Sequence, residues 1–117
     1  MDLNQAIAKH AEWKVKFRTA IDKKQQLSVG ELARDNCCDL GRWLHGDGRA
    51  RHGSLASFQD CQSNHAAFHV QAGRVAQAIN DGRYAEAETM LGAVSQYGKA
   101  SQDVALAIRQ LKKDAGL

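Results

Sequence analysis

The sequence contains no proline, few aromatic residues and no long apolar run. Because proline is absent and apolar residues recur with the 3.6-residue period of a helix, the chain is predicted to be entirely helical. No apolar stretch approaches the roughly 20 residues that span a bilayer. The first residues, Met1–Gln5, also lack the basic and apolar regions of a secretory signal. We therefore expect a soluble cytoplasmic protein with no membrane span.

Cysteine and clustered charge are also scarce. The three cysteines, Cys37, Cys38 and Cys61, are an odd number and do not suggest a disulfide framework. In a reducing cytoplasm they are expected to be thiols. The formal net charge of +3 is small, and the basic residues are spread along the chain, so nucleic-acid binding is not expected. A chain of 117 residues, 44% of them hydrophobic, fits one domain over residues 1–117 with a single core.

Three helices are predicted in the N-terminal part of the chain, over Leu3–Lys24, Glu31–Cys37 and Cys38–Leu44. The first carries an apolar stripe that includes His10, so His10 is expected to point inward. Ser28 and Glu31 have the spacing of a capping box, which marks a helix start. The next segment, His45–Gly53, contains three glycines and is predicted to be a surface connection.

Two longer helices are predicted after this segment. Ser54 is expected to cap the first, which ends at Asp81–Gly82. Its inward face is predicted to consist of Leu55, Phe58, His65, Phe68, His69, Ala72, Val75 and Ile79. The second is expected over Tyr84–Ala115, closed by Gly116. It carries a heptad seam of Met90, Val94, Tyr97, Ser101, Val104, Ile108 and Leu111. The predicted fold is all-α, an up-down four-helix-type bundle with one or two short extra helices.

Histidine and cysteine residues in apolar sequence indicate a metal site. His65 and His69 lie four residues apart, on one face of the predicted helix, so both imidazoles can bind one ion. A closed zinc site takes four protein ligands, chiefly cysteine and histidine, and Cys38 and His10 are the best candidates for the other two. Cys61, four residues before His65, is the rival ligand. Three nearby aromatic residues could shield the metal from water: Trp13, Trp43 and Phe68.

Three motifs occur in order along the chain, spanning His10–Trp13, Cys38–Trp43 and His65–His69. They resemble the pattern of the chemoreceptor zinc-binding (CZB) domain family: His-x-x-aromatic, Cys-x-hydrophobic-Gly-x-aromatic and His-x-x-x-His. The resemblance covers nearly the whole chain. It implies that Zn²⁺ is bound by His10, Cys38, His65 and His69. Four other residues are not expected to be ligands: Cys37, His45, His52 and Cys61.

The proposed ligand set argues against catalysis. Four protein ligands leave no coordination position for water or substrate, and the residue after His65 is Ala66 rather than the glutamate of a His-Glu-x-x-His motif. An enzyme is therefore not expected. The family resemblance implies instead a homodimeric regulatory domain whose zinc occupancy modulates a chemoreceptor or a diguanylate cyclase, in cis or in trans.

The sequence is also compatible with other functions. The first is a redox sensor in which an oxidant such as hypochlorous acid attacks the zinc-bound Cys38 thiolate. The second is a dimerisation module stapled by zinc that does not switch. A hemerythrin-like di-iron bundle is a weaker alternative, because the chain has no His-x-x-x-Glu run.

Overall fold

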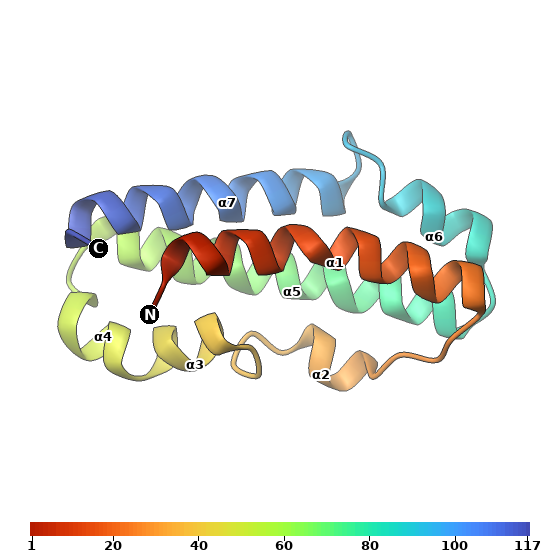
Figure 1. The fold of residues 1–117 in the computed structure, drawn as a ribbon, viewed down its shortest axis with the longest axis horizontal. Helices are drawn as coiled ribbons and strands as arrows, with labels where there is room; N and C mark the ends of the chain where they lie inside the picture. Colours follow the sequence, from red (N-terminus) through yellow and green to blue (C-terminus); the bar gives the residue numbers. More distant parts are fainter.

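Seven α-helices and their connections make up the computed structural model, which describes residues 1–117. The helices are α1 (Leu3–Lys23), α2 (Val29–Ala33), α3 (Asp39–His45), α4 (Asp47–His52), α5 (Ala56–Asn80), α6 (Tyr84–Met90) and α7 (Gln96–Ala115). The three long helices, α1, α5 and α7, run side by side along the 43 Å length of the molecule, and α2, α3 and α4 follow one another along the same bundle (Figure 1). The predicted all-α bundle is confirmed, with four short helices instead of one or two.

The core lies between the apolar faces of the long helices. α5 packs against α7 and α2, and α1 packs against α7 and α5. Phe17 on α1, Phe58 and Phe68 on α5 and Ile108 on α7 are each at most 1% exposed. Burying side chains of this size stabilises the fold by about 1.5–3 kcal/mol each. This packing holds the inward faces of α1 and α5, which carry three of the candidate ligands, at fixed positions.

The predicted connection at His45–Gly53 does lie mostly at the surface, but it is not a loop, because most of it forms helix α4. Gly48 is buried there, and a Cβ atom at this position would lie 2.6 Å from the indole ring of Trp43. Glycine therefore serves close packing of α4 on Trp43 rather than a flexible loop. The predicted cap at Ser54 is wrong: α5 begins at Ala56, and Leu55 holds the N-cap position without a side-chain hydrogen bond.

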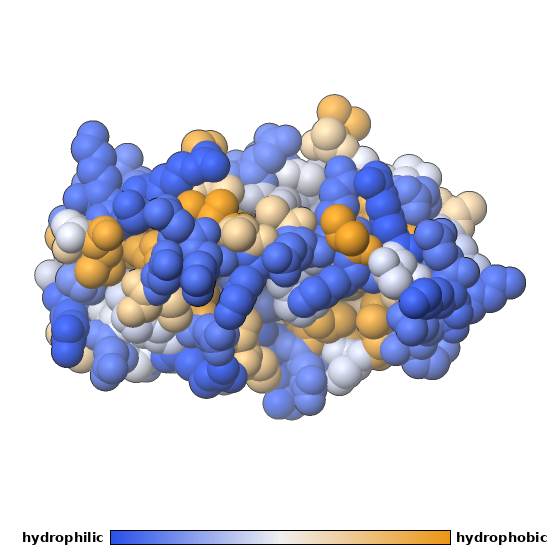
Figure 2. All heavy atoms as spheres, viewed as in Figure 1, coloured by the Kyte–Doolittle hydropathy of each residue, from blue (hydrophilic) through white to orange (hydrophobic).

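The predicted single C-terminal helix is broken between α6 and α7. The hydroxyl of Ser95 accepts a hydrogen bond from the backbone N–H of Gly98 at 3.0 Å and so caps the start of α7. Val94 is fully exposed in the connection, which forms an apolar tip on the surface (Figures 1 and 2). The remaining apolar residues of the α7 seam are buried in the bundle core: Tyr97, Val104, Ile108 and Leu111.

The predicted helix over Glu31–Cys37 is displaced toward the N-terminus. α2 ends at Ala33, and the chain is irregular from Arg34 to Cys38, the N-cap residue of α3. Ser28 is the N-cap residue of α2 but forms no side-chain cap hydrogen bond. None of the helices is apolar over a length that could span a bilayer.

Candidate metal centre

Four side chains from three parts of the chain meet inside the bundle. His10 comes from α1, Cys38 from the start of α3, and His65 and His69 from α5. One potential ligand atom from each residue lies within 4.8 Å of the other three. The three histidines are buried and Cys38 is partly exposed. The four residues singled out by the sequence motifs therefore do lie together.

Five of the six distances between these atoms lie within a few tenths of an ångström of the spacing that zinc requires. Nε2 of His65 lies 3.2 Å from Nε2 of His10 and 3.1 Å from Nε2 of His69. The sulfur of Cys38 lies 3.2 Å from Nε2 of His65, 3.6 Å from that of His69 and 3.9 Å from that of His10. Ligand atoms in a tetrahedral site with zinc–nitrogen and zinc–sulfur bonds of ordinary length are about 3.3–3.6 Å apart. The residues present therefore fit Zn²⁺.

Hydrogen bonds on the far side of two imidazole rings fix their orientation. Nδ1–H of His10 donates to the carbonyl oxygen of Ala6 at 2.7 Å, and Nδ1–H of His69 donates to that of Leu32 at 2.8 Å. Because a carbonyl oxygen only accepts, Nδ1 carries the proton in both rings and the lone pair lies on Nε2. Both lone pairs then point into the cluster, and a cation between them would remove their mutual repulsion.

Burial keeps the three imidazoles neutral. It lowers the pKa of His10 and His69, and it lowers the pKa of His65 to about 2. Burial also raises the pKa of the Cys38 thiol, an effect that the backbone N–H of Gly41 partly opposes. Neutral imidazole is the form that binds a metal ion, and a bound cation would favour the Cys38 thiolate. The cluster is therefore suited to a cation rather than an anion.

Aromatic rings cover part of the cluster, as the sequence suggested. The ring centroid of Phe68 lies 5.3 Å from that of His10 and 5.6 Å from that of His69, and Trp13 lies 6.2 Å from His69. Trp43 has different aromatic neighbours. Its ring packs against His52 of α4 and Phe58 of α5, so it stabilises the packing of α3 on these two helices.

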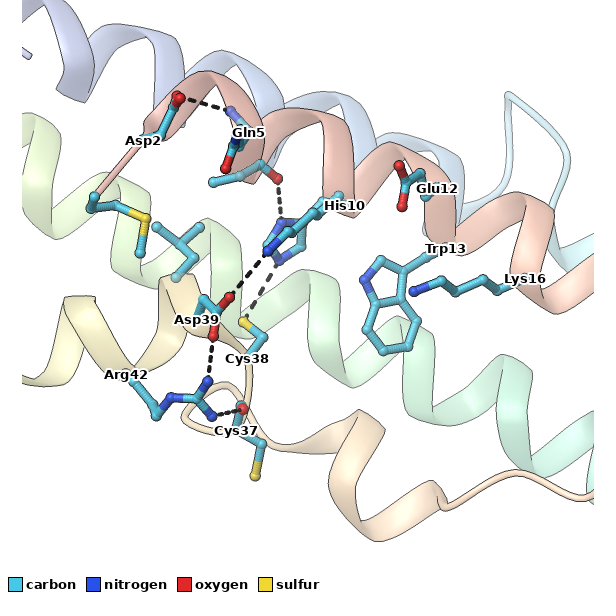
Figure 3. A pocket seen from close by; sticks show the side chains of 14 residues that line it. Asp2, Gln5, His10, Glu12, Trp13, Lys16, Cys37, Cys38, Asp39 and Arg42 are labelled. Carbon is cyan, nitrogen blue, oxygen red and sulfur yellow. Dashed lines mark hydrogen bonds and ion pairs between the residues drawn. The ribbon is translucent and has the colours of Figure 1, made fainter.

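A cavity of about 530 Å³ opens on the side of the cluster formed by His10 and Cys38 (Figure 3). It lies between α1 and the segment 37–42. At its rim Asp39 pairs with Lys9 at 3.1 Å and also with Arg42. Since His65 and His69 do not line the cavity, a solute in it would reach the cluster from the Cys38 side.

The remaining cysteines and histidines lie outside the cluster. Cys61 is fully buried in α5, where burial raises its pKa to about 12. The sulfur of Cys37 contacts the side chain of Asn36 at 3.6 Å. His45 pairs with Asp35 at 3.1 Å, and His52 is half-buried against Trp43.

The sequence analysis assigned no structural role to two glycines that position the ligands, although Gly41 is the glycine of the Cys38–Trp43 motif. A Cβ at Gly73 of α5 would lie 2.8 Å from Cβ of Ala33, so this glycine lets α2 pack closely and places the Leu32 carbonyl beside His69. Gly41 donates its N–H to the Cys38 sulfur at 3.3 Å, and the carbonyl of Asp35 occupies the space that a Cβ would need. A glycine inside a helical pattern was the available signal for both positions.

The fold and this cluster define the chain as a helical bundle with a His₃Cys group that can hold a metal ion. The sequence model of the chemoreceptor zinc-binding domain matches residues 10–76, which is more than half of the chain and includes all four cluster residues. The chain belongs to this family. Comparisons with curated proteins and with solved structures gave no match.

Proposed function

We propose that this chain is a regulatory domain in which His10, Cys38, His65 and His69 bind Zn²⁺. The observation that carries the proposal is the convergence of three Nε2 atoms and one sulfur within 4.8 Å, with two imidazoles oriented from behind. Imidazole and thiolate ligands in a four-residue set are typical of zinc. The use of four protein ligands favours regulation over catalysis, because no position remains for substrate.

The family supports the proposal of a signalling partner. Its description, chemoreceptor zinc-binding domain, supports a role in bacterial signalling in which zinc occupancy changes the output of a chemoreceptor or a diguanylate cyclase, in cis or in trans. We propose a cytoplasmic location and a homodimer on the same basis. The whole chain, residues 1–117, then acts as one domain.

The segment 34–38 is the element that we expect to respond to zinc. Its backbone is irregular, and Cys38 links it to α1 and α5 through the cluster. Binding stabilises the arrangement that holds the metal by an amount that grows with the logarithm of free zinc over its dissociation constant. A segment with few buried apolar contacts is the first to loosen when that stabilisation is lost. Zinc binding would thus order the backbone at the start of α3, and zinc loss would loosen it.

Redox sensing is the second candidate function. Cys38 is partly exposed and lines the cavity, so an oxidant can reach its sulfur. Oxidation would weaken its bond to the metal and release the same segment. In this case a mild oxidant should modify Cys38 before the buried Cys61.

A zinc-stapled dimer without switching has less support. The heptad seam of α7 that suggested it is mostly buried in the bundle core and is not free for a partner. Identical self-association and solution structure with and without zinc would favour this function over the regulatory one.

Elemental analysis of protein purified without added metal tests the proposal. Wild type and Cys61→Ala should each contain about one zinc per chain, and Cys38→Ala should contain less or bind it more weakly. Cys61→Ala is the matched control because it removes a thiol from outside the cluster. Absence of bound metal after zinc loading, or its loss in Cys61→Ala alone, would show that the ligand assignment is wrong.

A further inference from the structure

Cys37 and Cys38 are adjacent thiols that line the same cavity, and both are partly exposed. Their side chains point in opposite directions: the Cys38 sulfur faces His10, whereas the Cys37 sulfur points away from the cluster (Figure 3). The backbone explains this, because Cys38 is extended, with φ −83° and ψ 165°. In extended chains successive side chains alternate in direction. Cys37 is therefore excluded from the cluster as long as Cys38 takes part in it.

We propose that Cys37 is a resolving thiol, which forms a disulfide with Cys38 after a hydroperoxide has oxidised Cys38. The inference rests on the proposed zinc ligation, since loss of the metal is what frees Cys38 to turn toward its neighbour. It goes further by assigning a role to a cysteine outside the cluster. The resulting disulfide would keep Cys38 from rebinding the metal until a thiol reductant opened it.

The chemistry takes place in two steps. The Cys38 thiolate attacks one oxygen of hydrogen peroxide, the O–O bond breaks, and Cys38 becomes a sulfenic acid as hydroxide leaves. The Cys37 sulfur then attacks the Cys38 sulfur, the S–S bond forms, and the S–O bond breaks. The departing hydroxide takes the Cys37 proton and leaves as water. The two cysteines are oxidised by two electrons, and the peroxide is reduced to hydroxide and water.

The backbone at the pair is irregular, and an exposed side chain is the hydrogen-bond donor to the Cys37 carbonyl. The pair lies at the end of the irregular segment between α2 and α3. The Cys37 carbonyl is held by the exposed side chain of Arg42, at 2.6 Å. Adjacent Cα atoms are about 3.8 Å apart across a trans peptide, closer than the roughly 4.4–6.8 Å of most disulfides, so the product is strained. Strain makes a disulfide easier to reduce, which suits a reversible response.

Cys61 serves as the internal control. It is fully buried in α5 and does not line the cavity, so it has no access to the oxidant or to Cys38 from that side. The sulfur of Cys37 points away from the cluster and bonds to the side chain of Asn36, so Cys37→Ser should leave zinc binding intact. The two variants therefore separate the resolving role from a general effect of removing a thiol.

The experiment begins with the zinc content of wild type, Cys37→Ser and Cys61→Ala. Each protein is then treated with hydrogen peroxide while zinc release is followed with a chromogenic chelator, and the products are mapped by mass spectrometry. We expect wild type and Cys61→Ala to release zinc, lose two hydrogens in a Cys37–Cys38 disulfide, and regain zinc after reduction by dithiothreitol. Cys37→Ser should release zinc, gain oxygen atoms on Cys38 and recover little zinc after reduction, because sulfinic acid is not reduced by thiols.

The other outcomes overturn specific parts of the proposal. Zinc-loaded wild type that accumulates sulfinic acid, forms a disulfide between two chains, or recovers no better than Cys37→Ser would overturn the resolving role alone. Protein that holds no zinc before peroxide is added would overturn the proposed function and, with it, this inference.

Discussion

The imidazole of His69 donates its Nδ1–H to the backbone carbonyl of Leu32 at 2.8 Å. This bond joins the candidate metal centre to α2, a five-residue helix that packs on α5. Partners behind a metal ligand fix its tautomer and orientation, and losing one typically lowers affinity 10- to 100-fold. The position of α2 and the affinity for zinc should therefore depend on each other.

Gly73→Ala tests this dependence without altering a ligand. The new Cβ would lie 2.8 Å from Cβ of Ala33 and 3.3 Å from its Cα, so α2 must move away from α5 and take the Leu32 carbonyl with it. We expect zinc affinity to fall about 10-fold in a calorimetric titration. Ala33→Gly removes the opposing methyl, so the double variant should regain most of the affinity relative to Ala33→Gly alone. Additive effects of the two substitutions would show that the contact does not control the site.

Gly41→Ala should disturb the Cys38 side of the centre. The carbonyl of Asp35 occupies the position of the new Cβ, so the segment leading to Cys38 must be displaced, and the Gly41 N–H that bonds its sulfur at 3.3 Å moves as well. We expect zinc affinity to fall by at least about 10-fold. Gly30→Ala is the matched control, because a Cβ there meets nothing within 4 Å. Equal zinc affinity in both variants would contradict this account.

The helical fold and the burial of three histidines in one core could be predicted from spacing, whereas the choice of Cys38 over Cys61 followed from the family resemblance. His65 and His69 share a helix face, and His10 lies on the apolar stripe of α1, so burial brought them into one core. Helix α4 could not be predicted, since it requires Gly48 to pack against the ring of Trp43. The hydrogen bond to the Leu32 carbonyl could not be predicted either, because every residue has a backbone carbonyl and the sequence does not show which one accepts.

The break between α6 and α7 shows a second limit. A heptad seam continues from Met90 to Leu111, so the pattern indicated one helix over Tyr84–Ala115. The hydroxyl of Ser95 instead caps a new helix and also donates to the carbonyl of Met90 at 2.6 Å. Such capping competes locally with helix continuation, and tertiary packing decides between the two.

Asn80 should contribute strongly to stability, although no sequence pattern indicated this role. Its side chain accepts from the backbone N–H of Leu27 and donates to the Leu27 carbonyl, both at 2.8 Å, so it anchors the connection between α1 and α2. Asn80→Ala leaves both groups unpaired and should lower the free energy of unfolding by about 2 kcal/mol. Urea denaturation of the metal-free protein measures this loss.

Two variants serve as controls for the Asn80 prediction. Asn80→Asp keeps an acceptor for the Leu27 N–H but loses the donor, so its loss should be smaller. Asn64→Ala removes an amide that bonds only within α5, to the Asp60 carbonyl at 2.9 Å, and should change stability by less than about 0.5 kcal/mol. A similar loss in Asn64→Ala and Asn80→Ala would contradict the anchoring role.

The metal-free protein should become less stable as the pH falls from 7.5 to 5.5. Burial lowers the pKa of His10, His65 and His69 in the fold, whereas in the unfolded chain their pKa is near 6.5. Below this value the unfolded chain binds protons that the folded chain does not, so stability is present above pH 6.5 and is lost as the pH falls toward the folded pKa values. His65, with a folded pKa of about 2, should account for roughly 1 kcal/mol over this interval. His10 and His69 add to the loss in the same direction.

Urea denaturation at several pH values, with a chelator present, measures the slope. His65→Gln cannot titrate and should show a correspondingly flatter dependence, whereas an unchanged slope in this variant would mean that His65 is not held neutral by the fold.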